Sequence, residues 1–414
     1  MQVGSPTSPS SYEPGYHGSR RRILFSLTAC HTLNDILNIV IAPLIPLLRQ
    51  TFGLTFSQAG VLPFLSLALS SVLQPTLGYL ADRRRERTNL MGLGFIFMAA
   101  GMVMMGIANS YVVLLMAMLV IGIGASTYHP QSATFIAYYF KGERGKAQGI
   151  HGIGNGIAFI LAPLIVTRLG QDLGFKPVVF ILAVLGIIGA LLIWTQLREP
   201  AVTGSRGLWA GVNRSLIVLM FVNGLSIGVH TGVITWLPSF YFDRVGNLFT
   251  AGTLTAAMSV STLIAQPVGG QVSDLIGRRN VLFISVLGSS ASLALFVAVP
   301  TLASILGLAG VSVETGVFGN LPLVVLMTVP FTILFGFWGS LMPPVSMVYA
   351  SELATGERSG MAVGIVWGTG TALASVFPLI TGFLIESWDF EFTFISLVLV
   401  GPLIALITAL LPRA

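Results

Sequence analysis

The sequence predicts an all-α membrane protein with 12 transmembrane helices in two parallel six-helix halves, and three observations lead to this fold class. Of the 414 residues, 54% are hydrophobic and only 9% are charged, whereas soluble domains are about 25% charged. Apolar runs of about 20 residues, long enough to cross a hydrocarbon core of about 30 Å as a helix, recur along the chain. One short motif returns in both halves of the chain at a fixed offset.

The apolar runs divide the chain into four parts. Residues 1–20 are rich in Ser, Pro, Gly and Tyr and predict a disordered cytoplasmic tail. The amino-terminal half, residues 21–197, has runs near 23–48, 58–80, 88–107, 111–137, 147–169 and 177–197. A polar cytoplasmic linker follows at residues 198–213. The carboxy-terminal half, residues 214–414, has runs near 214–240, 250–272, 280–300, 321–349, 360–386 and 391–412.

The positive charges predict the orientation of these runs. With the amino terminus inside, 17 of the 21 Lys and Arg residues fall in cytoplasmic segments, as the positive-inside rule requires. We therefore expect a multi-pass protein of the cytoplasmic (inner) membrane with both termini in the cytoplasm. The net charge of +6 is then a topology signal, and no nucleic-acid partner is expected. The single cysteine, Cys30, excludes a disulfide framework and a cysteine metal cluster.

An internal repeat relates the two halves. The motif Gln-Pro-x-x-Gly-x-x-x-Asp occupies residues 74–82 and again residues 266–274, an offset of 192. Pro163-Leu164-Ile165 likewise matches Pro378-Leu379-Ile380. The second half carries about 22 extra residues, which fall in the Gly-rich stretch near 301–320 on the outer face. Two parallel halves are the arrangement of transporters whose repeats are related by an axis along the membrane normal.

The repeated loops carry the family resemblance. They hold a candidate conformational latch, made of Gly78, Asp82, Arg83, Gly270, Asp274, Arg278 and Arg279. Each glycine is expected to let two helices approach closely, and each aspartate to sit at a helix end or pair with an arginine. The loops resemble the signature Gly-x-x-x-Asp-Arg-x-Gly-Arg-Lys of the major facilitator superfamily. The resemblance implies the major facilitator fold.

A buried acid marks the candidate coupling centre. Asp35 lies about 18 Å along the first run, near the midplane, where a charge costs roughly 2.5–3.5 kcal/mol. His31 lies four residues earlier on the same helix face. His129, in the fourth run, lies about 12 Å deep, and His230, in the seventh, matches Asn38 at the repeat offset. Because histidine titrates near neutral pH, we expect these four titratable residues to couple transport to protons; the alternative is interhelical hydrogen bonding.

Other polar and aromatic residues within the runs are candidates to line a substrate cavity. They are Asn34, Asn38, Gln131, His151, Asn155, Asn223, Trp236 and Trp338. Each has an alternative role, because polar residues also join helices within the membrane and aromatic residues also fill the core. No metal site is expected.

The first half also resembles one branch of the family. The pattern His31-x-x-x-Asp35, the stretch 43–48, Gly124–Pro130 and Ala147–Gly149 are similar to the fosmidomycin-resistance branch. That resemblance implies a proton-driven exporter (antiporter) of small drugs or metabolites, an activity that confers antibiotic resistance by efflux. The relay arginine of many drug antiporters would fall at Met118. A proton-coupled uptake symporter of a small organic solute therefore stays open.

Missing motifs narrow the function class. The sequence has no Gly-x-x-x-x-Gly-Lys-Ser/Thr loop for a nucleotide and neither a His-Glu-x-x-His nor a Gly-x-Ser-x-Gly motif. We therefore expect no enzyme and no cofactor, and transport driven by a gradient. The expected partners are a small-molecule substrate, protons and the lipid bilayer, and the chain is expected to act as a monomer.

Overall fold

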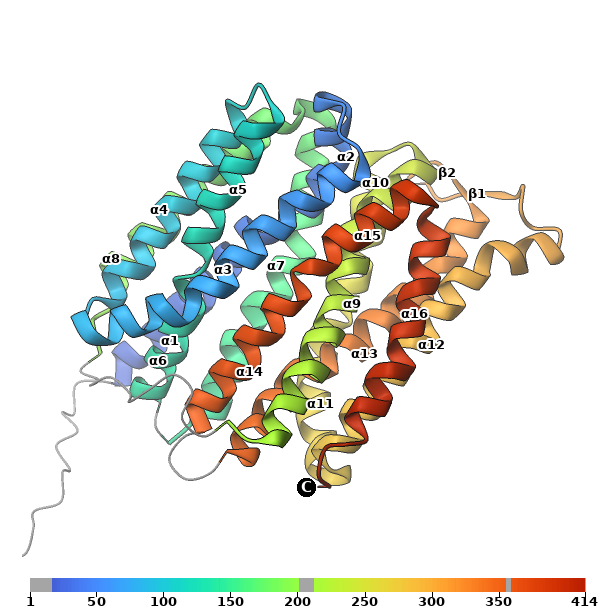
Figure 1. Cartoon of the computed structure of the whole chain (residues 1–414). Helices are drawn as coiled ribbons and strands as arrows, with labels where there is room; N and C mark the ends of the chain where they lie inside the picture. The colour runs from blue at the N-terminus through green and yellow to red at the C-terminus, as the bar shows by residue number, and fades with distance from the viewer. Residues whose placement is uncertain (1–16, 141, 201–211, 317, 355–358, 414) are drawn as a thin grey trace, which may run out of the picture.

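The computed structural model describes residues 17–140, 142–200, 212–316, 318–354 and 359–413. Most of the predicted tail and most of the predicted linker lie outside these residues. Residues 17–20 are described, and they are the first residues of a helix rather than part of a tail. The described chain is a bundle of long helices (Figure 1), so the predicted all-α class is confirmed.

The amino-terminal half comprises eight helices. They are α1 (His17–Ile39), α2 (Ile41–Phe52), α3 (Phe56–Arg84), α4 (Arg87–Gly106), α5 (Tyr111–Ala125), α6 (Tyr128–Tyr139), α7 (Arg144–Leu173) and α8 (Phe175–Gln196). The carboxy-terminal half comprises α9 (Arg214–Val245), α10 (Leu248–Val260), α11 (Thr262–Ile276), α12 (Arg278–Ile305), α13 (Leu323–Leu353), α14 (Ser359–Ala374), α15 (Val376–Ser387) and α16 (Phe390–Thr408).

Twelve spans long and apolar enough to cross a membrane occur among the described residues, and they match the twelve predicted runs. Four of these spans are broken into two helices each, namely α1–α2, α5–α6, α10–α11 and α14–α15. At three of the breaks the residue four positions before a proline lies at the end of the first helix: Ile39 before Pro43, Ser126 before Pro130 and Ala374 before Pro378. A proline has no N–H to bond the carbonyl four residues earlier, so each of these breaks lies where one intrahelical hydrogen bond is missing.

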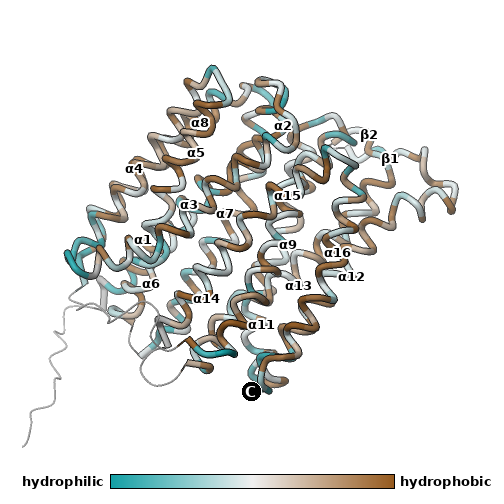
Figure 2. The backbone as a smooth tube through the Cα atoms, viewed as in Figure 1, coloured by the Kyte–Doolittle hydropathy of each residue, from teal (hydrophilic) through white to brown (hydrophobic). Residues whose placement is uncertain are grey.

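The surface of the bundle is apolar along its length. Large hydrophobic side chains such as Val184 and Leu191 on α8 and Leu399 and Leu406 on α16 are more than half exposed. Figure 2 shows hydrophilic residues gathered at the turns, where the helices end. Exposed apolar side chains suit contact with lipid, and the protein is a multi-pass membrane protein.

The two halves contact each other along α3 and α14, where the Ser71 hydroxyl donates to that of Thr371 at 3.1 Å, and at the upper end of the bundle in Figure 1, which carries α2 and α10. There the backbone N–H of Ser57 donates to Glu386 (2.8 Å) and that of Phe249 donates to Gln171 (2.9 Å). The ring of Phe56 packs edge-on against Trp236 at 5.6 Å. The halves are therefore joined along α3 and α14 as well as at the upper end.

The extra segment of the second half forms a small hairpin. Strands β1 (Ser312–Glu314) and β2 (Asn320–Pro322) pair antiparallel, with Val313 opposite Leu321. The hairpin lies between α12 and α13 at the upper end (Figure 1). The excess of residues predicted its place in the chain, but its strands are too short for a pattern to reveal them.

Candidate functional site

The candidate site forms where two of the broken spans meet. Asp35 lies one turn before the break that ends α1, and it is 4% exposed. Nε2 of His31, on the same face of α1, lies 3.2 Å from Oδ2 of Asp35. Both groups are thus withdrawn from solvent and in contact with each other.

His129 approaches the same carboxylate from the other broken span. It lies in the first turn of α6, directly after the break. Its Nε2 is 3.8 Å from Oδ1 of Asp35, and its ring meets that of His31 edge-on at 5.4 Å. The His129 side chain is 28% exposed, against 9% for His31. His129 is therefore the more solvent-accessible imidazole beside Asp35.

Two amides complete the surroundings of Asp35. Nδ2 of Asn155 donates to Oδ2 at 2.7 Å, and Nδ2 of Asn34 donates to Oδ1 at 3.0 Å. Each carboxylate oxygen therefore accepts an N–H, which stabilises the ionised form. The sequence placed both asparagines among cavity candidates; the structure places them on the acid itself.

Close packing of α1 on α7 builds this arrangement. Nδ1 of His31 lies 2.9 Å from the carbonyl oxygen of His151, and the Thr32 hydroxyl donates to the carbonyl of Gly154 at 3.1 Å. A Cβ at position 154 would lie only 2.5 Å from the carbonyl oxygen of Thr28. Glycine is required here because the two backbones approach so closely.

These contacts determine where His31 holds its protons. A carbonyl oxygen only accepts, so Nδ1 of His31 must donate to it. Nε2 then faces Oδ2 of Asp35, and one proton lies between these two atoms, either on the imidazole or on the carboxyl group. Without that proton two lone pairs would face each other at 3.2 Å. The pair is thus built to hold one proton.

Sequence reasoning missed one residue of the site, Tyr128. Its ring is 1% exposed and stacks near His31 at 5.7 Å and His151 at 6.1 Å. The available signal was its place beside His129 in an apolar run. His151, predicted to line the cavity, is only 2% exposed and stacks on His31 with ring centroids 4.2 Å apart.

The side chains of His31, Asp35 and His129 are also of the kinds that bind metal ions. The ligand atoms of His31, Asp35 and His129 all lie within 4.8 Å of one another, which is close enough to share an ion. Both oxygens of Asp35, however, already accept amide N–H groups. Each oxygen keeps a second lone pair beside its amide hydrogen, so the absence of a metal site stays a prediction.

The remaining candidates lie elsewhere. His230 stacks on Phe335 of α13 at 5.4 Å, and no described contact joins it to Asp35. Asn223 accepts from Ser346 and donates to the carbonyl of Val366, which ties three helices together. The roles of both residues stay predictions.

Four further cavity candidates are also placed. Gln131 is buried, and its amide reaches the carbonyl of Leu77 at 3.5 Å. Trp236 is fully buried and donates to Thr381 at 2.8 Å, and Trp338 packs against Gly288 of α12. Asn38 is half-buried, and its Oδ1 has no partner among the described residues.

The candidate latch differs between its two copies. Arg278 pairs with Asp274 at 2.5 Å and with Glu352 at 3.1 Å, as the pairing expectation anticipates. Arg279 is half-buried, Arg83 is exposed, and the side chain of Asp82 lies outside the described residues. The expectation of close helix approach is wrong for Gly270, because a Cβ there would meet nothing within 4 Å, and at Gly78 the nearest atom lies 3.5 Å away.

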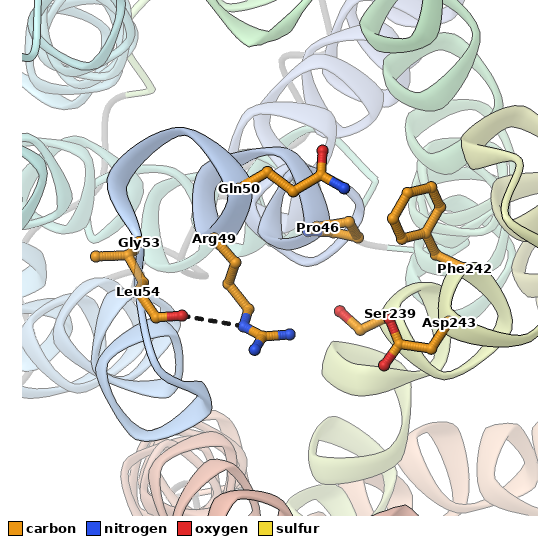
Figure 3. A pocket seen from close by; sticks show the side chains of 8 residues that line it. All are labelled: Pro46, Arg49, Gln50, Gly53, Leu54, Ser239, Phe242 and Asp243. Atoms are coloured by element: carbon orange, nitrogen blue, oxygen red, sulfur yellow. Dashed lines mark hydrogen bonds between the residues drawn. The ribbon is translucent and has the colours of Figure 1, made fainter.

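A separate pocket lies between the halves at the upper end (Figure 3). Arg49 of α2 faces Asp243 and Ser239 of α9 across it, and its Nε donates to the carbonyl of Leu54 at 3.2 Å. The guanidinium also lies 3.4 Å above the ring of Phe56. The Ser239 hydroxyl is buried and has no partner among the described residues. The pocket thus marks a polar seam where the halves close.

Comparisons with known proteins find a matching family model and similar curated proteins. The model of the Major Facilitator Superfamily matches residues 27–246 and 216–414. The chain is 27% identical to the MFS-type transporter YfnC of Bacillus subtilis (strain 168) over 409 residues, 94% of this chain and 92% of that protein. It is 26% identical to the fosmidomycin resistance protein of Escherichia coli (strain K12) over 404 residues, with the same two coverages.

Solved structures share the fold. A bacterial homologue of the human lysosomal transporter Spinster, in an inward-facing and occupied conformation, superposes with a TM-score of 0.79 at 16% identity, covering 96% of this chain and 97% of that one. A variant of the nucleoside transporter NupG gives 0.76 at 14% identity, covering 94% and 100%. At these identities the likeness establishes the fold alone, and the predicted fold is confirmed.

Proposed function

Since the chain belongs to the major facilitator superfamily and is a secondary transporter rather than an enzyme, we propose that it exports small drugs or metabolites in exchange for protons. The observation that carries the proposal is the buried contact of 3.2 Å between His31 Nε2 and Asp35 Oδ2. A buried acid paired with an imidazole can load a proton from one side of the membrane and release it to the other.

His129 supplies the route to solvent in this proposal. It contacts the second oxygen of Asp35 and is the most exposed member of the group. A proton arriving from water meets the His129 imidazole before it reaches the buried pair. His129 thus acts as the shuttle, and His31 and Asp35 as the store.

Alternating access links that proton to the substrate. Contacts between the halves such as Ser57 to Glu386 lie at the upper end, which the charge count assigns to the outside. Protonation cancels the net negative charge of the His31–Asp35 pair, whose carboxylate accepts from the Asn34 and Asn155 amides. The equilibrium between the inward-open and outward-open conformations then shifts. Substrate and proton both act on this same equilibrium. Both termini are cytoplasmic in this scheme.

The branch resemblance and the name of the Escherichia coli relative support export. One observation favours the alternative, a proton-coupled uptake symporter: Met118, fully buried in α5, stands where many drug antiporters have an arginine. The same proton store serves either direction.

Proteoliposomes with an imposed pH gradient test the proposal. The probes are fosmidomycin and a panel of small drugs and organic solutes, assayed with wild type and with Asp35→Asn. Movement of a probe against the proton flow establishes export, and joint movement establishes uptake. If no probe responds to the gradient and Asp35→Asn leaves drug susceptibility of expressing cells unchanged, the proposal fails.

A further inference from the structure

Two further buried rings, those of His151 and Tyr128, lie beside His31 and close to each other. His151 lies almost parallel to His31, with an interplanar angle of 15° and 4.2 Å between ring centroids. Tyr128 lies parallel to His151 at 11° and 6.1 Å. The rings come from α1, α6 and α7, so the stack joins three helices at the level of the proton store.

The hydroxyl of Tyr128 determines the tautomer of His151. Its oxygen lies 2.5 Å from the carbonyl oxygen of Leu27, so its one proton points to that carbonyl. The same hydroxyl oxygen lies 3.2 Å from Nε2 of His151. Since its proton is already used, the hydroxyl can only accept there, and His151 must carry a proton on Nε2.

The other nitrogen of His151 is left without a role in hydrogen bonding. Nδ1 is buried and has no partner among the described residues. A proton on it would make His151 a cation facing His31 and Asp35 of α1 and Tyr128 and His129 of α6. When the store holds its proton as a cation on His31, two stacked imidazolium rings 4.2 Å apart would repel. A neutral ring instead attracts the cation through its face.

We infer that Tyr128 and His151 are positioning residues of the proton store. Tyr128 keeps His151 neutral with its proton on Nε2, so the coupling proton is taken by the His31–Asp35 pair alone. This inference rests on the proposed function. Its consequence is that one of the two stacked imidazoles titrates and the other does not, although both are histidines at the same depth.

Nitrogen NMR of the full chain, labelled with ¹⁵N-histidine and held in lipid, reports tautomer and charge directly. The His151 signal is identified by its loss in His151→Gln. We expect this signal to remain that of the neutral Nε2–H form at every pH, while the His31 signal changes with pH. Tyr128→Phe removes the acceptor and should change the His151 tautomer ratio by about two- to tenfold, the worth of one buried hydrogen bond. Tyr241→Phe, a buried tyrosine bonded to Thr328 in the other half, should change nothing.

Transport provides the second readout. His151→Phe keeps a ring but loses the donor, and it should move the pH midpoint of proton-driven transport. His151→Gln keeps an N–H for Tyr128 and should restore that midpoint. The inference is overturned if His151 titrates together with His31, or if folded His151→Gln loses proton-driven transport, since His151 would then carry the proton itself. If the predicted tautomers are found but no pH gradient drives transport, the proposed function fails and the tautomer assignment stands.

Discussion

Asp35 and His31 face each other across 3.2 Å, with the second ring nitrogen of His31 committed to a backbone carbonyl. This geometry leaves one place for an exchangeable proton. Because the Asp35 side chain is only 6% exposed, the charge of the pair is felt by the surrounding helices rather than screened by water.

Asp35→Asn should abolish proton-driven accumulation while leaving exchange of substrate for substrate intact. Asparagine keeps the shape of the side chain but can neither bind nor release a proton. The measurement is probe uptake into proteoliposomes with and without a pH gradient. Asp172→Asn, which alters an exposed acid paired with Arg168 at 3.2 Å, should behave as wild type; equal loss in both variants would contradict the account.

Asn155→Ala should move the pH midpoint of transport upward by about one to two units. The variant removes the 2.7 Å amide bond to Asp35, and a hydrogen bond to a charged group is worth about 1.5–3 kcal/mol. The carboxylate is then less favoured relative to the protonated acid, so the proton is retained to higher pH. The check is transport rate against pH, with Asn280→Ala as the control, an exposed asparagine that donates to the carbonyl of Ile276 at 2.7 Å; a downward shift would argue against the assignment.

Gly154→Ala should lower stability by about 1–3 kcal/mol, the usual cost of overpacking, and should weaken proton coupling. The new methyl group would lie 2.5 Å from the carbonyl of Thr28 and would push α1 off α7. Thermal unfolding of the purified protein measures the first effect. Gly149→Ala, on the exposed face of the same helix with nothing within 4 Å, should leave proton coupling unchanged and raise stability by about 0.5–1 kcal/mol, the usual gain of alanine over glycine within a helix. A fully stable and fully coupled Gly154→Ala would show that the helix contact is not needed.

Glu386→Ala should loosen closure of the upper end, because Glu386 accepts from Ser57 across the two halves. A cysteine placed at the buried Ser239 of the pocket, in a Cys30→Ser background, reports opening through labelling by a membrane-impermeant maleimide added outside. The expected result is faster labelling. Glu391→Ala breaks a pair with Arg244 inside one half and should not speed labelling; a matching increase there would point to general loosening instead.

Much of the fold could be predicted because it depends on local properties of the chain. Run length predicts the twelve spans, and the prolines at 43, 130 and 378 explain three helix breaks. The placement of Asp35 and His31 on one helix face follows from helix periodicity alone. The sequence could not predict which carbonyl each nitrogen would meet.

The rest of the site depends on packing between helices. The approach of Gly154 to Thr28 brings Asn155 onto Asp35, and no spacing within one helix reveals that. Tyr128 was missed because its hydroxyl finds its partners on two other helices. Trp236 is an example of the opposite error, since a large aromatic predicted for the cavity fills the packed interior.

The most direct test of the central claim is pH-difference infrared spectroscopy of the full chain in lipid, which detects protonation without a substrate. A titrating carboxyl–imidazole signal is expected in wild type and in Asp172→Asn, and its absence is expected in Asp35→Asn. Difference spectra that are the same in wild type and Asp35→Asn would contradict the central claim, because the proton would then be held elsewhere.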